Sequence, residues 1–337
     1  MRVSKLTAPK KIELFDEPMV REPGTGEARI KVKAVGICGT DLHIFLGERS
    51  DVELPRVMGH ELSGIVEKVG EGVTNVKAGD CVVFDPVVAC GTCKTCKSGH
   101  ENVCADVKCF GVQMDGGFQD YIVVDAKKLY KYPDTIPFEE AALAEPFSVA
   151  ANILTRVAAA AKDRIVIIGA GTIGLAILQA AKGMGASVLI SDVEDKKLKI
   201  AGEFGADATV NSKKQNLAEQ VMAFAPDGAD VLIDAVGIAP LTEQTIDMAS
   251  PVARIAVIGF DSHPMQLAPV SITKRELTLV GSRMNNGMFP KVVEWLEKGC
   301  LNTAGMVTRA YPVEEIQRAF TDTLANSDST VKTIIKF

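Results

Sequence analysis

Polar and apolar residues alternate along the first part of the chain. The run Ala28–Val35 alternates between the two kinds, and Cys81–Phe84 and Tyr121–Val124 are short β-rich runs between glycine and aspartate turns. Alternation is typical of strands, because successive side chains of a strand point to opposite faces of the sheet. The pattern predicts an irregular β domain over residues 1–147.

Near residue 148 the pattern changes to continuous apolar strands separated by segments of helical period. Strands are predicted at Arg164–Ile168, Ala186–Ile190, Asp230–Asp234 and Arg254–Ile258, and helices at Ile173–Lys182 and Lys197–Phe204. Strands that are apolar on both faces are typical of a parallel sheet covered by helices. We therefore expect a doubly wound α/β domain of the Rossmann type over residues 148–285, followed by a segment 286–337 with a helix at Phe289–Lys298 and a closing strand at Val331–Phe337.

Composition and charge narrow the class of protein. The 337 residues are 47% hydrophobic and 24% charged, and no apolar stretch is long enough to cross a bilayer. The first residues lack the apolar core of a secretory signal, so we expect a cytoplasmic protein with reduced thiols. A net charge of −6 without a basic block argues against nucleic acid as a partner. A protein with no membrane or nucleic-acid partner is the expectation.

Four of the eight cysteines form one closely spaced run, Cys90, Cys93, Cys96 and Cys104. Short gaps allow one loop to bring four thiolates to a single ion, which is the donor set of a closed, structural zinc site. Two alternatives remain open from spacing alone: a disulfide pair, and an iron–sulfur cluster. Zinc is the interpretation that the spacing favours.

A glycine motif, Gly169–Gly174, follows the predicted strand Arg164–Ile168 and begins a helix. In this context the glycines allow a tight turn, close approach of a pyrophosphate and close packing of helix on strand. Asp192 ends the next strand, where a carboxylate can accept hydrogen bonds from ribose hydroxyls and repels a 2′-phosphate. The motif favours NAD over NADP, although Lys196 and Lys197 keep NADP open, and Asp192 has the alternative role of a helix N-cap.

A second set of metal-ligand types lies in glycine-bounded turns. Cys38 follows an alternating strand, His60 and Glu61 come about twenty residues later, and Glu145 is the charged residue of a short apolar run before Pro146. A thiolate, an imidazole and a carboxylate from separate loops are typical of an open, catalytic zinc site. The alternatives are a buried free cysteine, a packed histidine and a solvated glutamate where the helix breaks before proline.

Taken together, these motifs resemble the zinc-dependent medium-chain dehydrogenases. The resemblance covers the whole chain in order. Because an acidic residue, Glu145, stands at this position, the chain resembles the polyol, threonine and sugar-acid branch of the family. The segments Asp85–Cys90, Ala249–Ile255 and Gly281–Asn285 look most similar to bacterial hexonate oxidoreductases that act on L-gulonate or L-galactonate. The resemblance implies a GroES-like catalytic domain built from both chain ends, an inserted Rossmann domain and an active site in the cleft between them.

The resemblance also implies roles for individual residues. Cys38 and His60 would bind the catalytic zinc, Glu61 would bind it directly or through water, and Glu145 would be an exchangeable ligand. Thr40 and His43 would relay the proton. The positions expected to contact NAD(H) are Gly169, Gly171, Thr172, Ile173, Gly174, Asp192, Lys197, Val236, Ile258, Gly259, Phe260, Ser282 and Arg283. Lys197 departs from the arginine that is frequent in relatives.

The expected activity is zinc-dependent, NAD(H)-linked interconversion of a secondary hydroxyl and a ketone on a sugar acid. A carboxylate substrate needs a local cation, and Arg49 and Arg283 are the candidates. Dehydrogenation of a neutral polyol or of L-threonine is the alternative, and an NADH-binding sensor without turnover is an alternative of a different class. We also expect a homo-oligomer, a dimer or a tetramer, with the apolar strand Glu276–Val280 as the pairing edge.

Overall fold

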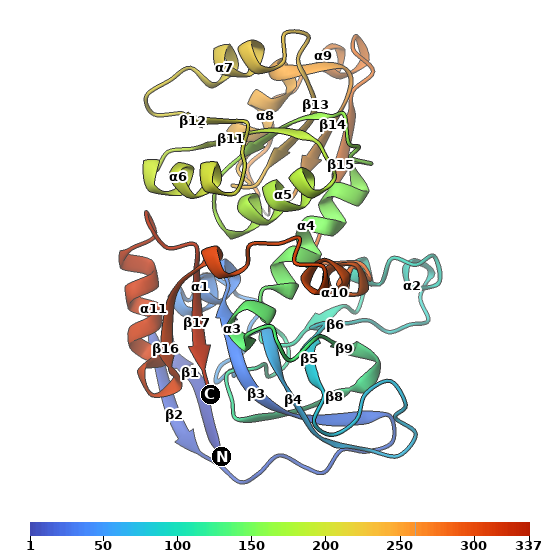
Figure 1. The fold of residues 1–337 in the computed structure, drawn as a ribbon, viewed down its shortest axis with the longest axis vertical. Helices are drawn as coiled ribbons and strands as arrows, with labels where there is room; N and C mark the ends of the chain where they lie inside the picture. The colour runs from blue at the N-terminus through green and yellow to red at the C-terminus, as the bar shows by residue number, and fades with distance from the viewer. Residues whose placement is uncertain (260) are drawn as a thin grey trace. The chain divides into compact units, whose positions relative to one another are not determined.

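The computed structural model describes every residue except Phe260, and it divides the chain into two compact units (Figure 1). The terminal unit comprises Met1–Ser148 and Asn285–Phe337, and the central unit comprises Val149–Met284. The division falls within one helix, α4 (Ala144–Arg156). The two ends of the chain therefore fold together, and its middle forms a unit of its own.

A mixed sheet of seven strands organises the terminal unit. In sheet order its strands are β16 (Val307–Pro312), β17 (Lys332–Lys336), β3 (Glu27–Ile37), β4 (Glu61–Val69), β5 (Cys81–Phe84) and β9 (Leu129–Lys131), with β8 (Tyr121–Asp125) paired to β3. The smaller pairs are β1 (Arg2–Ala8) with β2 (Lys11–Asp16), and β6 (Val87–Val88) with β7 (Lys108–Cys109). The irregular β domain expected from the alternating pattern is confirmed, and the last strand of the chain lies inside its sheet.

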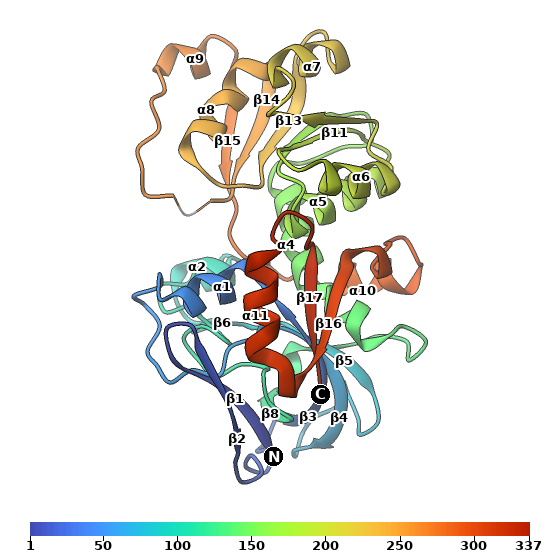
Figure 2. The same cartoon turned by 90° about the vertical axis from the view of Figure 1, so that its left-hand side faces the viewer.

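Helices surround this sheet in short pieces (Figure 2). They are α1 (Gly39–Leu46), α2 (Lys94–Lys97), α3 (Phe138–Ala141), α10 (Phe289–Glu297) and α11 (Ile316–Ala325), with single 3₁₀ turns η1 (Glu101–Val103), η2 (Ala126–Lys128), η3 (Ala304–Met306) and η4 (Val313–Glu315). Phe320 of α11 packs against Phe45 of α1 and against Phe118, with ring centroids 5.1 and 5.9 Å apart. All three rings are fully buried, so the C-terminal helix completes the core of the terminal unit.

The strand register next to the core decides where the polar residues of the terminal unit meet. β17 and β4 flank β3 on opposite sides, and both pair with it in the antiparallel sense. Gly36 of β3 lies opposite Glu61 on one side and opposite Ile334 on the other. The end of β3, the start of β4 and the start of β17 therefore come together at one place.

The central unit is a six-stranded parallel sheet in the order β12, β11, β10, β13, β14, β15. Its strands are β10 (Arg164–Ile168), β11 (Ser187–Asp192), β12 (Ala208–Asn211), β13 (Ala229–Asp234), β14 (Ala249–Val257) and β15 (Thr278–Gly281). Its helices are α5 (Thr172–Gly183), α6 (Asp195–Glu203), α7 (Leu217–Phe224), α8 (Ala239–Met248) and α9 (Pro269–Thr273). Renumbered from β10, the order is 3-2-1-4-5-6, which is the doubly wound order of the Rossmann fold, so the predicted fold class is confirmed.

Most predicted elements are present, with shifted ends. β14 begins five residues before the predicted strand, because its pairing with β13 continues across a bulge to Ala249. The helix expected to break at Glu145 instead begins there: α3 ends at Ala141, and α4 starts at Ala144 with Glu145 and Pro146 in its first turn. Proline is tolerated in a first turn because its missing N–H would have no helical partner there. No helix among the described residues is long and apolar enough to cross a membrane.

Truncation of the C-terminal helix anchor should destabilise the terminal unit. Phe320→Ala removes a fully buried ring, and we expect a loss of about 3–5 kcal/mol in the free energy of unfolding. The chain's one tryptophan, Trp295, lies in the terminal unit, so its fluorescence during urea unfolding follows that unit. Phe15→Ala, at a ring that is 38% exposed, is the control, and equal losses in the two variants would contradict the prediction.

Candidate active site

Three predicted metal ligands meet at the junction of β3 and β4. Cys38 is the N-cap residue of α1 directly after β3, and His60 and Glu61 lie at the start of β4. One ligand atom from each of these three residues lies within 4.8 Å of the other two. One sulfur, one nitrogen and one carboxylate oxygen are donors that zinc accepts, and three protein ligands leave a fourth position open.

The carboxylate of Glu61 has two different environments. Oε1 accepts a hydrogen bond from the Lys332 ammonium at 2.6 Å, whereas Oε2 is buried with no hydrogen-bond partner among the described residues. A side chain at Gly36 would place its Cβ only 2.0 Å from Oε2, so a glycine is required opposite this carboxylate. A buried carboxylate oxygen without a partner is costly, and a bound cation at this point would satisfy it.

Lys332 is a functional residue that the sequence analysis missed. Its side chain is 2% exposed, and it donates both to Glu61 and to the carbonyl of Ile37, at 3.0 Å. Burial lowers the pKa of Lys332, but the charge of Glu61 and its hydrogen bond, together with the charges of Cys38 and Glu145, outweigh burial and raise it. The sequence offered little signal, because the same strand also carries Thr333 and a second lysine, Lys336, and only burial and pairing set Lys332 apart.

Asp41 positions His60 and the start of α1. Its carboxylate is fully buried and accepts hydrogen bonds from the backbone N–H of Cys38 at 2.9 Å and of Gly59 at 3.2 Å. Asp41 Oδ1 also lies 3.7 Å from Nδ1 of His60, and a carboxylate beside one ring nitrogen is the usual partner of a metal-binding histidine. Nδ1 of His60 itself has no hydrogen-bond partner among the described residues, so Asp41 acts on the imidazole through its charge.

The site carries strongly shifted acids and bases. Burial raises the pKa of Asp41. Burial alone lowers the pKa of His60, but the negative charges of Asp41 and Cys38 outweigh it and raise that pKa well above its ordinary value. A metal-binding histidine is neutral, so metal binding has to displace this proton.

Glu145 is close to the site without belonging to the same tight group. It is 8% exposed in the first turn of α4, so the alternative of a solvated helix end is wrong. Burial raises the pKa of Glu145 to about 7, the charge of His60 opposes this shift, and that of Glu61 adds to it. Its carboxylate is not among the atoms that lie within 4.8 Å of one another, so its role as a metal ligand stays a prediction.

Thr40 and His43, the predicted proton relay, lie one turn apart on α1. Thr40 is half-buried, whereas the His43 side chain is 63% exposed. Nδ1 of His43 is 2.6 Å from Oε2 of Glu48. The helix thus runs from the predicted metal ligand Cys38 at its N-cap to a solvent-exposed histidine in its last turn.

The four clustered cysteines form a compact sulfur site. Distances between their sulfur atoms are 3.4 Å for Cys93–Cys96, 3.5 Å for Cys90–Cys104, 3.8 Å for Cys93–Cys104 and 4.0 Å for Cys90–Cys96. Four sulfurs placed tetrahedrally at the usual zinc–sulfur distance are about 3.8 Å apart. A disulfide would bring two sulfurs much closer, and all four cysteines are free. The geometry fits a closed zinc site better than the alternative of a disulfide.

The glycine motif of the central unit has the shape needed for a dinucleotide. Gly169 has a φ of +102°, and a Cβ at Gly174 would lie 1.8 Å from the Gly169 carbonyl oxygen. By contrast, no other described atom lies within 4 Å of a Cβ built at Gly171, the N-cap of α5. Two glycines are thus required by the turn, and the middle one leaves open space where a phosphate can approach the backbone.

The remaining predicted cofactor residues gather at the carboxyl ends of the parallel strands. Asp192 accepts hydrogen bonds from the backbone of Ala170 at 2.7 Å and of Glu194 at 2.9 Å. The N-cap of α6 is Glu194, so the alternative role of Asp192 as the helix cap is wrong. Val236 is 53% exposed, an unusual position for a valine. The other predicted residues at this end are Thr172, Ile173, Lys197, Ile258, Gly259, Ser282 and Arg283, while Phe260 lies outside the described residues.

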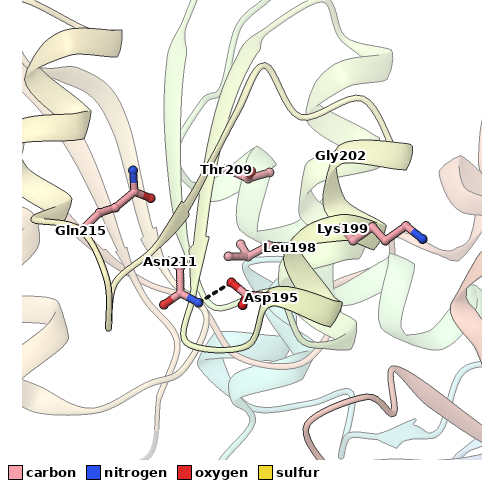
Figure 3. A pocket seen from close by; sticks show the side chains of 7 residues that line it. All are labelled: Asp195, Leu198, Lys199, Gly202, Thr209, Asn211 and Gln215. Atoms are coloured by element: carbon pink, nitrogen blue, oxygen red, sulfur yellow. Dashed lines mark hydrogen bonds between the residues drawn. The ribbon is translucent and has the colours of Figure 1, made fainter.

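A shallow pocket of about 380 Å³ also lies in the central unit, between α6 and β12 (Figure 3). It is lined by Asp195, Leu198, Lys199, Gly202, Thr209, Asn211 and Gln215. Asn211 donates a hydrogen bond to Asp195 at 2.6 Å across it. None of the predicted cofactor residues lines this pocket, so it is separate from the glycine motif.

The two candidate substrate cations differ in their surroundings. The Arg49 guanidinium donates to both carboxylate oxygens of Asp51, at 2.7 Å each. Gln113 also donates to Asp51, at 2.9 Å. Arg283 is exposed and lies just after the end of β15. The charge of Arg49 is therefore already balanced by a neighbour, which weakens its claim to a substrate carboxylate.

Comparisons with known proteins agree with the fold. Residues 24–134 match the alcohol dehydrogenase GroES-like domain family, and residues 172–298 match the zinc-binding dehydrogenase family. The chain is 38% identical to the starvation-sensing protein RspB of Escherichia coli, over 90% of each protein. It is 34% identical to a 2-dehydro-3-deoxy-L-galactonate 5-dehydrogenase of Pseudoalteromonas atlantica, over 88% of each protein. A crystal structure of an alcohol dehydrogenase, rspB of E. coli, complexed with NADH superposes with a TM-score of 0.94 and 35% identity, and covers 100% of this chain and 99% of that one.

A GroES-like unit, a Rossmann unit and a cysteine–histidine–glutamate site define a zinc-type dehydrogenase. The chain belongs to the zinc-binding alcohol dehydrogenase family, in its polyol and sugar-acid branch. Oxidoreductase chemistry, zinc and a nicotinamide dinucleotide are properties of this family, so the predicted enzyme class and cofactors are confirmed.

Loss of one clustered cysteine should remove one zinc ion from each chain. Cys93→Ser deprives the sulfur site of a ligand, and we expect metal analysis to give one zinc per chain instead of about two, together with a lower unfolding temperature. Cys300→Ser, at an exposed cysteine far along the chain, is the matched control. Unchanged zinc stoichiometry in Cys93→Ser would contradict the structural zinc site.

Breaking the buried ion pair of the active site should destabilise the terminal unit. Lys332→Met leaves the Glu61 carboxylate buried and unpaired. We therefore expect the free energy of unfolding to fall by about 3–5 kcal/mol. The double variant Lys332→Met with Glu61→Gln should lose clearly less, because no buried charge remains. Urea unfolding followed by Trp295 fluorescence, after a chelator has removed zinc from all variants, measures both.

Lys336→Met is the control for this prediction, because Lys336 lies on the same strand with a half-exposed side chain. We expect it to change the free energy of unfolding little, as is usual for exposed ion pairs. A Lys332→Met variant as stable as Lys336→Met would show that the pair does not hold the site together.

Proposed function

We propose that the protein is an NAD(H)-dependent zinc dehydrogenase that interconverts a secondary hydroxyl and a ketone on a sugar acid such as L-gulonate or L-galactonate. The observation that carries the proposal is the convergence of Cys38, His60 and Glu61, with the buried Oε2 of Glu61 left without a partner. A preformed set of three donors around an unsatisfied oxygen is what an open metal site needs.

Cys38, His60 and Glu61 would hold the catalytic ion, and the cysteine run would hold a second, structural one. When bound, the catalytic zinc polarises the substrate hydroxyl and stabilises the negative charge that develops on its oxygen. Glu145, buried nearby with a pKa raised by burial to about 7, is available as a further ligand or as a proton acceptor. His60, Glu61 and Glu145 are buried, whereas Cys38 is half-buried.

The proton of the hydroxyl needs a path to solvent. In this proposal Thr40 accepts it, and His43 releases it from the exposed end of α1. The helix supports this order, because Thr40 follows the metal ligand Cys38 by two residues and is half-buried, whereas His43 is exposed. Thr40 and His43 would then be connected through the ribose hydroxyl of the bound cofactor, as the family resemblance implies.

The cofactor is assigned to the glycine motif and the strand ends of the central unit. The open space at Gly171 would take the pyrophosphate at the N-terminus of α5. Asp192 would accept hydrogen bonds from the adenosine ribose, and a carboxylate there disfavours the extra phosphate of NADP. Val236 and Ile258 supply apolar surface at neighbouring strand ends. NAD(H) is therefore the preferred cofactor.

Two observations bear on the substrate. A relative is named as acting on a 2-dehydro-3-deoxy-galactonate, which supports a sugar acid. The pairing of Arg49 with Asp51 favours the alternative of a neutral polyol, because it leaves less positive charge for a carboxylate. L-threonine is a further candidate of the same branch. The name of RspB as a starvation-sensing protein keeps the alternative of an NADH-binding sensor without turnover.

Assembly and location remain predictions. β15 is an edge strand of the parallel sheet, as expected for the pairing edge of a dimer or tetramer. An edge with unpaired backbone groups can extend its sheet across a two-fold axis. A homo-oligomer in the cytoplasm is the expectation.

A substrate panel tests the proposed function directly. We expect NAD reduction with L-galactonate or L-gulonate at a kcat/KM at least about tenfold above that with sorbitol, galactitol or L-threonine, which corresponds to about 1.4 kcal/mol. Chelator treatment or His60→Ala should abolish the activity. A higher kcat/KM for a polyol than for both sugar acids would contradict the sugar-acid assignment and support a neutral polyol as the substrate. Tight NADH binding without turnover of any substrate would support the NADH-binding sensor.

A further inference from the structure

The last turn of α1 ends in a specific capping motif. Gly47 adopts the left-handed conformation, with φ of +79°, and its N–H bonds to the carbonyl of Ile44 at 3.0 Å. The next N–H, that of Glu48, bonds to the carbonyl of His43, also at 3.0 Å. These two bonds define a Schellman motif, in which the residue after the left-handed glycine folds back over the last turn of the helix.

In most Schellman motifs the folded-back residue makes an apolar contact with that turn. Here the contact is between a carboxylate and an imidazole: Oε2 of Glu48 lies 2.6 Å from Nδ1 of His43. Among the described residues, Glu48 is the one charged side chain at ion-pair distance from His43. The backbone conformation of the cap therefore places the Glu48 side chain beside His43.

The neighbouring charges have other partners. Arg49 pairs with Asp51. On α11, which packs against α1, Arg318 pairs with Glu315 at 2.9 Å and with Asp322 at 3.2 Å. His43 is thus paired to Glu48 rather than placed in a wider charge network.

The pair has a defined chemical consequence. An ionised carboxylate only accepts hydrogen bonds, so the hydrogen of the neutral imidazole is held on Nδ1. Nε2 is then the basic nitrogen, and it is the atom free to take up a proton. A fixed tautomer with one nitrogen directed to a carboxylate is the arrangement that lets a histidine act as a proton acceptor.

We propose that Glu48 is the positioning residue of the proton relay: it holds His43 in the Nδ1–H tautomer and leaves Nε2 to receive the substrate-derived proton. This inference rests on the proposed function, because it needs His43 to act as the relay's exit. It adds to the relay a residue that contacts neither the metal ligands nor the glycine motif. The Schellman cap sets its position, so the role is built into the end of the helix.

The test compares Glu48→Gln, Glu48→Asp and His43→Gln in the zinc-loaded enzyme. The rate of the first turnover with NAD and L-galactonate, or with sorbitol if the panel selects it, is measured by stopped flow, because cofactor release often limits kcat. Glu315→Gln, which breaks another exposed ion pair of the terminal unit, is the matched control. Imidazole is added as an external proton acceptor.

We expect Glu48→Gln to slow the first turnover by about threefold to tenfold, a part of the usual effect of a general base. His43→Gln should slow it more, added imidazole should restore both, and Glu48→Asp and Glu315→Gln should remain near the wild-type rate. A second readout is independent of turnover: ¹⁵N spectra of the four histidines. In Glu48→Gln the His43 signals should move from one tautomer to a mixture, while those of His263 stay unchanged.

Two results would overturn the proposal, and they are distinguishable. If Glu48→Gln shows wild-type turnover and an unchanged His43 tautomer while His43→Gln is impaired, Glu48 has no positioning role, and the proton relay through His43 still stands. Wild-type turnover in His43→Gln would remove the relay itself, and with it the role of Glu48. In that second case the zinc site and the cofactor assignment of the proposed function still stand.

Discussion

The buried ion pair between Lys332 and Glu61 is the constraint on which the candidate active site depends. Both side chains are almost fully removed from water, and such a pair is tolerated only when its geometry and its remaining hydrogen bonds are good. Lys332 meets this condition by donating a hydrogen bond also to the carbonyl of Ile37, next to the predicted metal ligand Cys38. The strand that carries Lys332 is the last of the chain, so the site is complete only after the C-terminal segment has joined the sheet.

Charge distinguishes this candidate metal site from an ordinary core. Cys38, Asp41, Glu61 and Glu145 supply more negative charge than His60 and Lys332 balance. Burial raises the pKa values of Asp41 and Glu145, whereas burial lowers that of His60 and the neighbouring negative charges outweigh it and raise it. In the proposed site a divalent cation would replace protons on these groups, beside the Glu61 oxygen that has no hydrogen-bond partner among the described residues.

The helix α1 combines several parts of the site in two turns. Its N-cap is Cys38, its third residue Asp41 accepts from the Cys38 backbone, and its last turn presents His43 to Glu48. The proposed role of each side chain follows from its position along the helix: metal binding at the start, and proton release from the exposed end. The cysteine run differs in kind, because four equal sulfur donors close the coordination sphere and leave no place for substrate.

The sequence by itself determined the fold class, the glycine motif, the two sets of candidate zinc ligands and the family. These features depend on local spacing and on residue types that have few alternative uses. Only the tertiary structure decided how residues distant in sequence meet. Lys332 and Glu61 are brought together by the pairing of two strands with β3, and no local pattern records that register. The helix start at Ala144 and the cap that places Glu48 on His43 were likewise decided by three-dimensional packing and backbone geometry. Short motifs specify which chemistry is available, whereas strand register and helix ends specify which of those groups touch.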